Sequence, residues 1–217
     1  MGSSPIILDP VVMPLIRGPR ILDIGCGFGR WGVLLTSNYW ETRGDQKAAR
    51  PEVIGCDGFM PNAVLAWKTG FFAQLVHAIF PPLPFKTSSF DTVLLLDVIE
   101  HLKKEEGLQL VEEAKRVASH RVILSTPNYH AIRDAHATMT GWNQFEAHLS
   151  HWPRPYLRRL GFRLLGAGWR PGGRYWRGGL RRINLLPFYD HVLRPWLASL
   201  SLYVPIFSQN EVGVWEN

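Results

Sequence analysis

The stretch from Ile21 to Gly32 contains residues whose types and spacing suit the binding of a nucleotide-like cofactor. It reads ILDIGCGFGRWG, with one acid, Asp23, ahead of four glycines within eight residues. Counted from Gly25, the glycines follow G-x-G-x-G; counted from Gly27, they follow G-x-G-x-x-G, the dinucleotide fingerprint. The two patterns predict different cofactors and therefore different reactions.

The acids around these glycines distinguish the two patterns. The apolar run RILDI ends at Ile24, so Gly25 is the natural turn residue and the first pattern is in register. A dinucleotide would place its pyrophosphate at the N-terminus of the next helix, close to the carboxylate of Asp23. S-adenosylmethionine has no phosphate and carries two positive groups, a sulfonium and an ammonium, which Asp23 favours. Asp57 ends the next apolar run, where it can accept both ribose hydroxyls.

Histidines are the candidates for proton transfer. In DVIEHL, Asp97, Glu100 and His101 lie at i, i+3 and i+4, which predicts one face of a helical turn. Methylation of a hydroxyl usually needs a base, and histidine has a suitable unperturbed pKa. We predict His101 and His148 as catalytic residues; the alternative is that His101 caps or packs against the following helix. The other candidates are His130, His136 and His151.

The first half of the chain alternates strands with helices. Apolar runs predict strands at 20–25, 52–58, within 71–79, at 90–98 and at 121–127. Apolar residues at helical spacing predict helices at 30–37, 62–68 and 103–118. This alternation predicts a parallel sheet covered on both faces. Beyond residue 128 we expect a short helix at 155–160 and strands at 161–169 and 210–216.

Several motifs together resemble those of the class I S-adenosylmethionine-dependent methyltransferases. They are Asp23-x-Gly25-x-Gly27-x-Gly29, the acid Asp57, LPFKTSSFDTVLLLDVIEHL and STPNYH. The chain is most similar to the broad subfamily with E-H-L after the fourth strand. The resemblance implies an α/β fold with a doubly wound, mostly parallel seven-stranded sheet whose last strand is antiparallel. It also implies a C-terminal helical cap at 183–207, within a single domain of residues 1–217. It also implies methyl transfer from S-adenosylmethionine, with S-adenosylhomocysteine as product.

The resemblance further assigns residues to the cofactor. The loop glycines would let the backbone approach the methionine part, Asp57 would hold the ribose, and Gly58 and Phe59 would lie along the adenine. The family often has an acid after the third strand, but the stretch here is VHAIFPPLPF. We therefore expect Ala78 and Ile79 to meet the adenine through backbone groups or apolar contact. The predicted cofactor-binding set is Asp23, Gly25, Cys26, Gly27, Gly29, Asp57, Gly58, Phe59, Ala78, Ile79 and Asp97.

A metal site is an alternative use of the acid-histidine cluster. His148 in FEAHLSHW resembles a histidine of small-RNA 2′-O-methyltransferases, which are similar around STPN and bind a divalent metal through an E-x-x-E-H pattern. Asp97 replaces the first glutamate of that pattern and is one methylene shorter. We therefore predict no metal, and the alternative is a cluster of Asp97, Glu100, His101 and His148.

Composition and charge bear on the acceptor. The chain has 217 residues, 46% of them hydrophobic, and a formal net charge of +6. Residues 147–189 contain nine arginines and no acid. The arginines beside the apolar segment 183–207 favour a small-molecule or lipid-like acceptor and peripheral membrane contact. The absence of an N/D-P-P-Y motif favours oxygen as the methylated atom. RNA bound by the Arg-rich segment 154–182 is the alternative.

The remaining features concern location and class. Two cysteines, Cys26 and Cys56, make no disulfide framework, and no signal peptide or apolar membrane span is recognisable, so we expect a cytoplasmic protein. Two other classes stay open: an NAD-dependent oxidoreductase using the second glycine pattern, and a non-catalytic cofactor-binding module. Asp23 and the lack of a Y-x-x-x-K pair count against the oxidoreductase.

Overall fold

The computed structural model describes residues 4–42, 50–128, 134–169 and 208–217. The chain begins with three short helical turns, η1 (Ile6–Leu8), α1 (Asp9–Val12) and η2 (Met13–Leu15). Strands and helices then alternate through β1 (Arg20–Ile24), α2 (Arg30–Thr42), β2 (Glu52–Asp57), α3 (Met60–Lys68), β3 (Gln74–His77), β4 (Phe90–Leu96), η3 (Ile99–His101), α4 (Lys104–Val117) and β5 (Ala118–Pro127). The second half adds β6 (His136–Thr138), β7 (Gly141–Asn143), η4 (Gln144–Glu146), α5 (Arg154–Arg159), β8 (Arg163–Trp169) and β9 (Ser208–Glu216).

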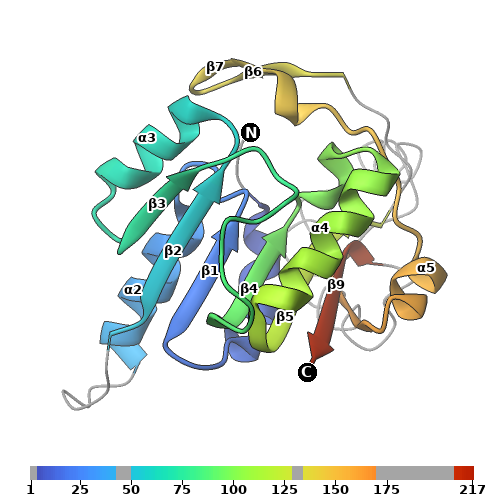
Figure 1. Cartoon of the computed structure of the whole chain (residues 1–217), viewed down its shortest axis with the longest axis horizontal. Coiled ribbons are helices and arrows are strands. Elements are labelled where there is room, and N and C mark those ends of the chain that lie inside the picture. Colours follow the sequence, from blue (N-terminus) through green and yellow to red (C-terminus); the bar gives the residue numbers. More distant parts are fainter. Residues whose placement is uncertain (1–3, 43–49, 129–133, 170–207) are drawn as a thin grey trace, which may run out of the picture.

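Seven of these strands form one sheet in the order β3-β2-β1-β4-β5-β9-β8 (Figure 1). The strands from β1 to β5 pair in parallel, whereas β9 runs antiparallel to both of its neighbours, β5 and β8. The predicted mostly parallel sheet with an antiparallel last strand is therefore confirmed. Strand order reverses between β1 and β4, and open α/β sheets bind ligands at the carboxyl ends of such strands.

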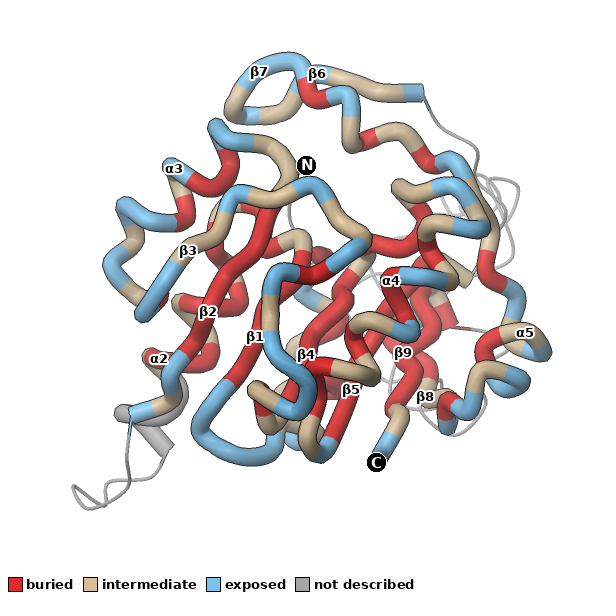
Figure 2. Tube along the Cα trace, viewed as in Figure 1, coloured by how far each residue is buried: buried red, intermediate tan, exposed pale blue. Residues whose placement is uncertain are grey.

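Helices cover both faces of the sheet, and the strands between them are buried (Figure 2). One core packs α4 and α5 on the sheet through residues such as Leu110 and Leu157. The other packs the N-terminal turns, α2 and α3 through residues such as Leu8, Trp31 and Ala66. Because successive residues of a strand face opposite sides, the nearly continuous apolar strands supply both cores.

Most predicted elements are confirmed, with longer ends. α2 runs to Thr42 rather than to residue 37, and β5 begins at Ala118 rather than at 121. The turns before β1 and the β6–β7 hairpin were not predicted, because elements of three or four residues show no periodicity. The predicted cap at 183–207 and the arginines from 170 onward lie outside the described residues. Within the described ranges, no helix is long and apolar enough to cross a membrane.

Candidate functional site

The glycine loop between β1 and α2 lies where the strand order reverses. Gly25, Gly27 and Gly29 have φ angles of 66°, 54° and 85°, a region that side chains disfavour. A Cβ at position 25 would lie 2.7 Å from Val98 Cγ2, and one at position 29 would lie 2.9 Å from Ala66 Cα. Only glycine allows this turn and these close contacts, so the loop presents its backbone at the edge of the sheet.

Asp57 joins this loop to the end of β2. Its carboxylate accepts the Gly27 N–H through Oδ2 and the Phe59 N–H through Oδ1, each at 2.8 Å. Burial raises the pKa of Asp57 to about 6, although the two N–H groups lower it; the charge of Glu146 raises it further. The carboxylate is thus fixed beside the loop, and its other lone pairs suit a vicinal diol.

Asp23 lies beneath the loop and is only 1% exposed. Its Oδ2 has no hydrogen-bond partner among the described residues. Burial, followed by the charge of Asp57, raises the pKa of Asp23 to about 8. The neighbouring thiols of Cys26 and Cys56 are free and buried, and burial raises the pKa of both, that of Cys56 to about 12. A ligand that brings positive charge would stabilise such a buried acid.

The predicted adenine edge follows β3. The Ala78 N–H donates to the Asp57 carbonyl at 3.2 Å, which keeps this residue next to β2, whereas Ile79 is 73% exposed. A residue that the sequence did not indicate also lies here: the Phe145 ring is 3.9 Å from the position that a Cβ on Gly58 would take. Phe145 belongs to η4, and no local motif marks it, because only the tertiary fold brings η4 over β2.

The segment 147–152 is held against η3. The Glu100 carbonyl accepts two backbone N–H groups of this segment, at 2.8 and 3.1 Å, and Trp152 Nε1 donates to the Ile99 carbonyl at 3.1 Å. Figure 1 shows the chain arching from the β6–β7 hairpin, above α3, over the end of the sheet to α5. These bonds bring His148 to the end of β4.

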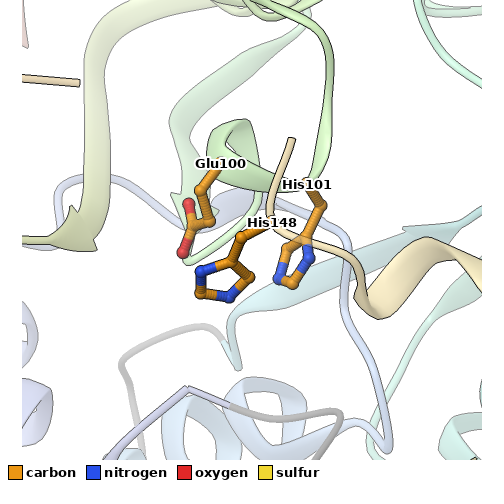
Figure 3. Close-up of side chains that lie close together, drawn as sticks. All are labelled: Glu100, His101 and His148. Atoms are coloured by element: carbon orange, nitrogen blue, oxygen red, sulfur yellow. The ribbon is translucent and has the colours of Figure 1, made fainter. Parts of the chain in front are cut away.

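Glu100, His101 and His148 point toward one another at this edge (Figure 3). Each offers a ligand atom within 4.8 Å of the others, and the two imidazole centroids are 4.8 Å apart with the rings at 85°. Glu100 is 2% exposed and His148 8%. His101 Nδ1 donates to the Ala147 carbonyl at 3.1 Å, so a neutral His101 carries its lone pair on Nε2. This chemistry suits either proton transfer or metal binding.

Neither His136 nor His151 belongs to this group of described residues. His136 Nε2 is 3.9 Å from a carboxylate oxygen of Glu146, and the His151 carbonyl accepts a hydrogen bond from Lys104 Nζ at 2.7 Å. His130 lies outside the described residues. The structure therefore brings together the two histidines that we predicted as catalytic.

The predicted helical turn is wrong for Asp97. η3 begins only at Ile99, and Asp97 has a left-handed φ of 56°, so it does not share a helical face with Glu100 and His101. Its carboxylate instead accepts hydrogen bonds from Ser125 and Asn210. Burial raises the pKa of Asp97 to about 6 against these two hydrogen bonds. The cluster among the described residues consequently has three members, not four.

Comparisons with known proteins bear on this geometry. Residues 22–125 match a family described as a methyltransferase domain. This range contains the glycine loop, Asp57 and the end of β4. No curated protein matches the chain.

Several solved structures are similar to this chain. A SAM-dependent methyltransferase from Archaeoglobus fulgidus is 16% identical, with 96% of this chain and 91% of that chain aligned at a TM-score of 0.53. Magnesium protoporphyrin IX methyltransferase from Synechocystis PCC 6803, determined with bound SAM, is 17% identical, with 98% and 76% aligned at 0.50. The PH0226 protein from Pyrococcus horikoshii OT3 is 25% identical, with 56% and 52% aligned at 0.47. This chain thus spans about half the length of the last protein.

The sheet order, the glycine loop and the acid ending β2 define an α/β fold built to hold a nucleoside at the reversal between β1 and β4. With the match of residues 22–125 to a methyltransferase domain, they give this chain the Rossmann-like fold of the S-adenosylmethionine-dependent methyltransferases.

Proposed function

We propose that this chain transfers the methyl group of S-adenosylmethionine to a hydroxyl oxygen of a small-molecule or lipid-like acceptor, with S-adenosylhomocysteine as product. Because a fold does not name an acceptor, the proposal depends on side chains at the site. The observation that carries it is the imidazole pair of His101 and His148. η3, which holds His101, follows directly after Val98, the residue that packs on Gly25 of the cofactor loop.

The predicted cofactor residues suit this ligand chemically. The carboxylate of Asp57 can accept two ribose hydroxyls, and Phe145 offers an aromatic surface near Gly58 for the adenine. The acids Asp23 and Asp97 match the two positive groups of the cofactor. When bound, the cofactor supplies an electrophilic methyl carbon on a sulfonium that leaves as a neutral thioether.

His101 is our candidate for the general base. Its Nδ1–H is bonded to the Ala147 carbonyl, so Nε2 can take the proton that the acceptor hydroxyl loses. The buried carboxylate of Glu100, close to both rings, stabilises the imidazolium that forms. His148 packs edge-on against His101 and fixes the ring in place.

The test follows tritium from methyl-labelled cofactor into panels of phenols, catechols and lipids. We expect His101→Ala to lower kcat by about 10²–10⁴-fold, the usual contribution of a general base, with S-adenosylhomocysteine affinity unchanged by calorimetry. His120→Ala is the matched control, because His120 lies on β5 with its side chain 67% exposed and packs outside the cluster. Full activity of His101→Ala would contradict the assignment.

The same three side chains also form a donor set that suits a divalent metal. Two imidazoles and one carboxylate suit zinc, manganese or iron and leave positions for other oxygen ligands. Metal analysis of the purified protein, together with Glu100→Gln, separates the two roles. If the purified protein holds stoichiometric metal, loses it in Glu100→Gln and loses its activity on chelation, the three side chains bind a metal and His101 is not the base. If the metal-free protein is active, the assignment of His101 as the base is supported.

Exposed apolar side chains favour the lipid-like acceptor over RNA. Met139 and Trp142 on the β6–β7 hairpin are 75% and 67% exposed, and the hairpin lies over the C-terminal edge of the sheet (Figure 1). Arg154 of the Arg-rich segment, by contrast, forms an ion pair with the buried carboxylate of Glu211, with Nε 3.3 Å from Oε1. Its charge is therefore used inside the protein and not for binding RNA. A cytoplasmic enzyme that touches a membrane surface through this hairpin fits these observations; RNA bound by the Arg-rich segment is the alternative.

A further inference from the structure

The ammonium of Lys104, the first residue of α4, lies in a slot formed by two aromatic rings and a carbonyl oxygen. Its Nζ is 3.5 Å from the centroid of the Trp152 ring and 4.2 Å from that of the Tyr156 ring. It also donates to the His151 carbonyl at 2.7 Å. The slot therefore joins the start of α4 to the segment 147–152 and to α5.

The slot depends on the positive charge of this side chain. Aromatic faces attract a cation within about 6 Å of the ring centroid, and the attraction grows as the cation loses water. Burial lowers the pKa of Lys104 to about 8, although the charge of Glu105 raises it. The ammonium is therefore charged at neutral pH and loses its proton as the pH rises through about 8.

Other titratable groups lie on the elements packed around the slot. They are Glu100 and His101 of η3, Lys103, Glu105 and Glu106 at the start of α4, His148 and His151 of the segment 147–152, and Arg154, Tyr156, Arg158 and Arg159 of α5. Among these groups, only Glu105 acts on the pKa of Lys104 by its charge. Arg154 and Arg158 act instead on the buried carboxylate of Glu211. The charge of the slot is therefore governed by Lys104 itself.

Trp152 connects the slot to the candidate site. Its Nε1 donates to the Ile99 carbonyl at 3.1 Å and to Ser150 Oγ at 2.9 Å, and the residue is 1% exposed. Ser150 Oγ in turn donates to the same Ile99 carbonyl at 3.1 Å. The ammonium on the face of the ring and these bonds at its edge together hold the segment 147–152 on η3. That segment carries one imidazole of the candidate pair, and η3 carries the other.

We propose that Lys104 is a positioning residue for methyl transfer, whose ammonium fixes the segment 147–152 and thereby the contact of His148 with His101. The inference rests on the proposed function, in which His101 takes the proton and His148 holds its ring in place. The centroids of the two imidazoles are 4.8 Å apart. Because a displacement of about 1 Å can lower a rate about 10²-fold, a contact outside the reacting groups can control kcat.

Lys104→Met and Lys104→Arg test the charge. Methionine keeps an unbranched apolar stem and removes the ammonium, whereas the arginine guanidinium stacks on aromatic faces and keeps its charge. We expect Lys104→Met to lower kcat about 5- to 100-fold, with the affinity for S-adenosylhomocysteine unchanged, and Lys104→Arg to keep most of kcat. Lys115→Met is the matched control, because Lys115 lies at the other end of α4 and donates to the Leu160 carbonyl at 3.0 Å.

The pH profile separates positioning from a general loss of structure. The wild-type kcat is expected to fall as the pH rises through about 8, because the slot loses its charge, whereas Lys104→Arg is expected to keep its kcat to about pH 9.5. Lys104→Met has no charge to lose and is expected to be slow at every pH in this range. An alkaline decline that is identical in the wild type and Lys104→Arg would overturn the proposal.

Hydrogen exchange tests the same contact without an acceptor. The N–H groups of residues 149–150 donate to the Glu100 carbonyl, so their protection reports whether the segment stays on η3. We expect Lys104→Met to lower this protection about 3- to 30-fold, the factor that corresponds to lost cation–π contacts, and Lys115→Met to leave it unchanged. Unchanged protection in Lys104→Met, or lower protection with wild-type kcat, would contradict the positioning role.

Tyr156→Leu serves if Lys104→Met does not fold. It removes a half-buried ring of the slot and leaves the Trp152 hydrogen bonds in place, so we expect about 2- to 10-fold losses of kcat and of protection. The double variant is expected to lose no more than Lys104→Met alone, because both changes remove one contact. Losses that multiply would show that the two side chains act separately and would refute the slot. A fully active His101→Ala would instead overturn the proposed function, on which the exchange measurement does not depend.

Discussion

Three acids at the ends of neighbouring strands, two of them buried and Asp97 partly buried, are held in three different ways, and the differences predict different effects on binding. Asp57 is oriented by backbone N–H groups, Asp97 by two side chains, and Asp23 has an oxygen without a hydrogen-bond partner in the described part of the chain. Hydrogen bonds to a carboxylate fix its direction, so Asp57 and Asp97 can select a ligand group by geometry. Asp23 can act only through its charge, because it is 1% exposed.

At the residue scale, Asp57→Ala is expected to weaken S-adenosylhomocysteine binding by about 1.5–3 kcal/mol, the cost of losing hydrogen bonds to a charged acceptor. The same loss is expected for 5′-methylthioadenosine, since both ligands carry the ribose. Titration calorimetry measures both, with Asp91→Asn as the control, because Asp91 lies at the opposite end of β4. An unchanged affinity would mean that the ribose lies elsewhere.

At the element scale, the sequence predicted what depends on local spacing. The glycine loop and Asp57 were recognisable because each sits directly at the end of an apolar strand. Gly32, the last glycine of the second pattern, packs α2 on the sheet, since a Cβ there would lie 2.4 Å from the Phe72 ring. Phe145, Ser125 and Asn210 were not recognisable, because their roles depend on contacts between distant elements.

Gly107 shows how an element positions the site. It lies in α4, and a Cβ there would lie 2.4 Å from Trp152 Cζ2, a ring that is 1% exposed and helps to hold the segment carrying His148. Alanine in a helix interior gains about 0.5–1 kcal/mol over glycine, but overpacking a rigid core costs about 1–3 kcal/mol. We therefore expect Gly107→Ala to lower the free energy of unfolding in urea by about 1–2 kcal/mol.

The double variant Gly107→Ala/Trp152→Phe separates the clash from other effects. The smaller ring makes room for the added methyl, so the cost of Gly107→Ala is expected to be smaller in a Trp152→Phe background. If Gly107→Ala lowers the free energy of unfolding equally in the wild-type and Trp152→Phe backgrounds, the added methyl does not clash with the Trp152 ring.

At the scale of the whole molecule, Asp23, Asp57 and Asp97 lie at the carboxyl ends of neighbouring strands, and none of them forms an ion pair within the described residues. Burial raises the pKa of Asp23 to about 8, those of Asp57 and Asp97 to about 6, and that of Glu211 to about 7. Each folded value lies above the ordinary value of 3.8 or 4.5, so the folded protein binds more protons than the unfolded chain between about pH 4 and 8. The ligand-free protein must then lose stability as pH rises through this window.

We expect the melting temperature of the ligand-free protein to fall by roughly 5 °C or more between pH 5 and pH 8, since about 1 kcal/mol shifts it by 2–4 °C at this size. Asp23→Asn should flatten the profile most, because its pKa is raised furthest among these acids. Saturating S-adenosylmethionine should raise the melting temperature more at pH 8 than at pH 5, because its cations compensate acids that are ionised only at the higher pH. Differential scanning calorimetry measures all three effects. A flat profile for the ligand-free protein would mean that these carboxyls titrate as they do in water, and the electrostatic match between this edge and a cationic cofactor would have to be abandoned.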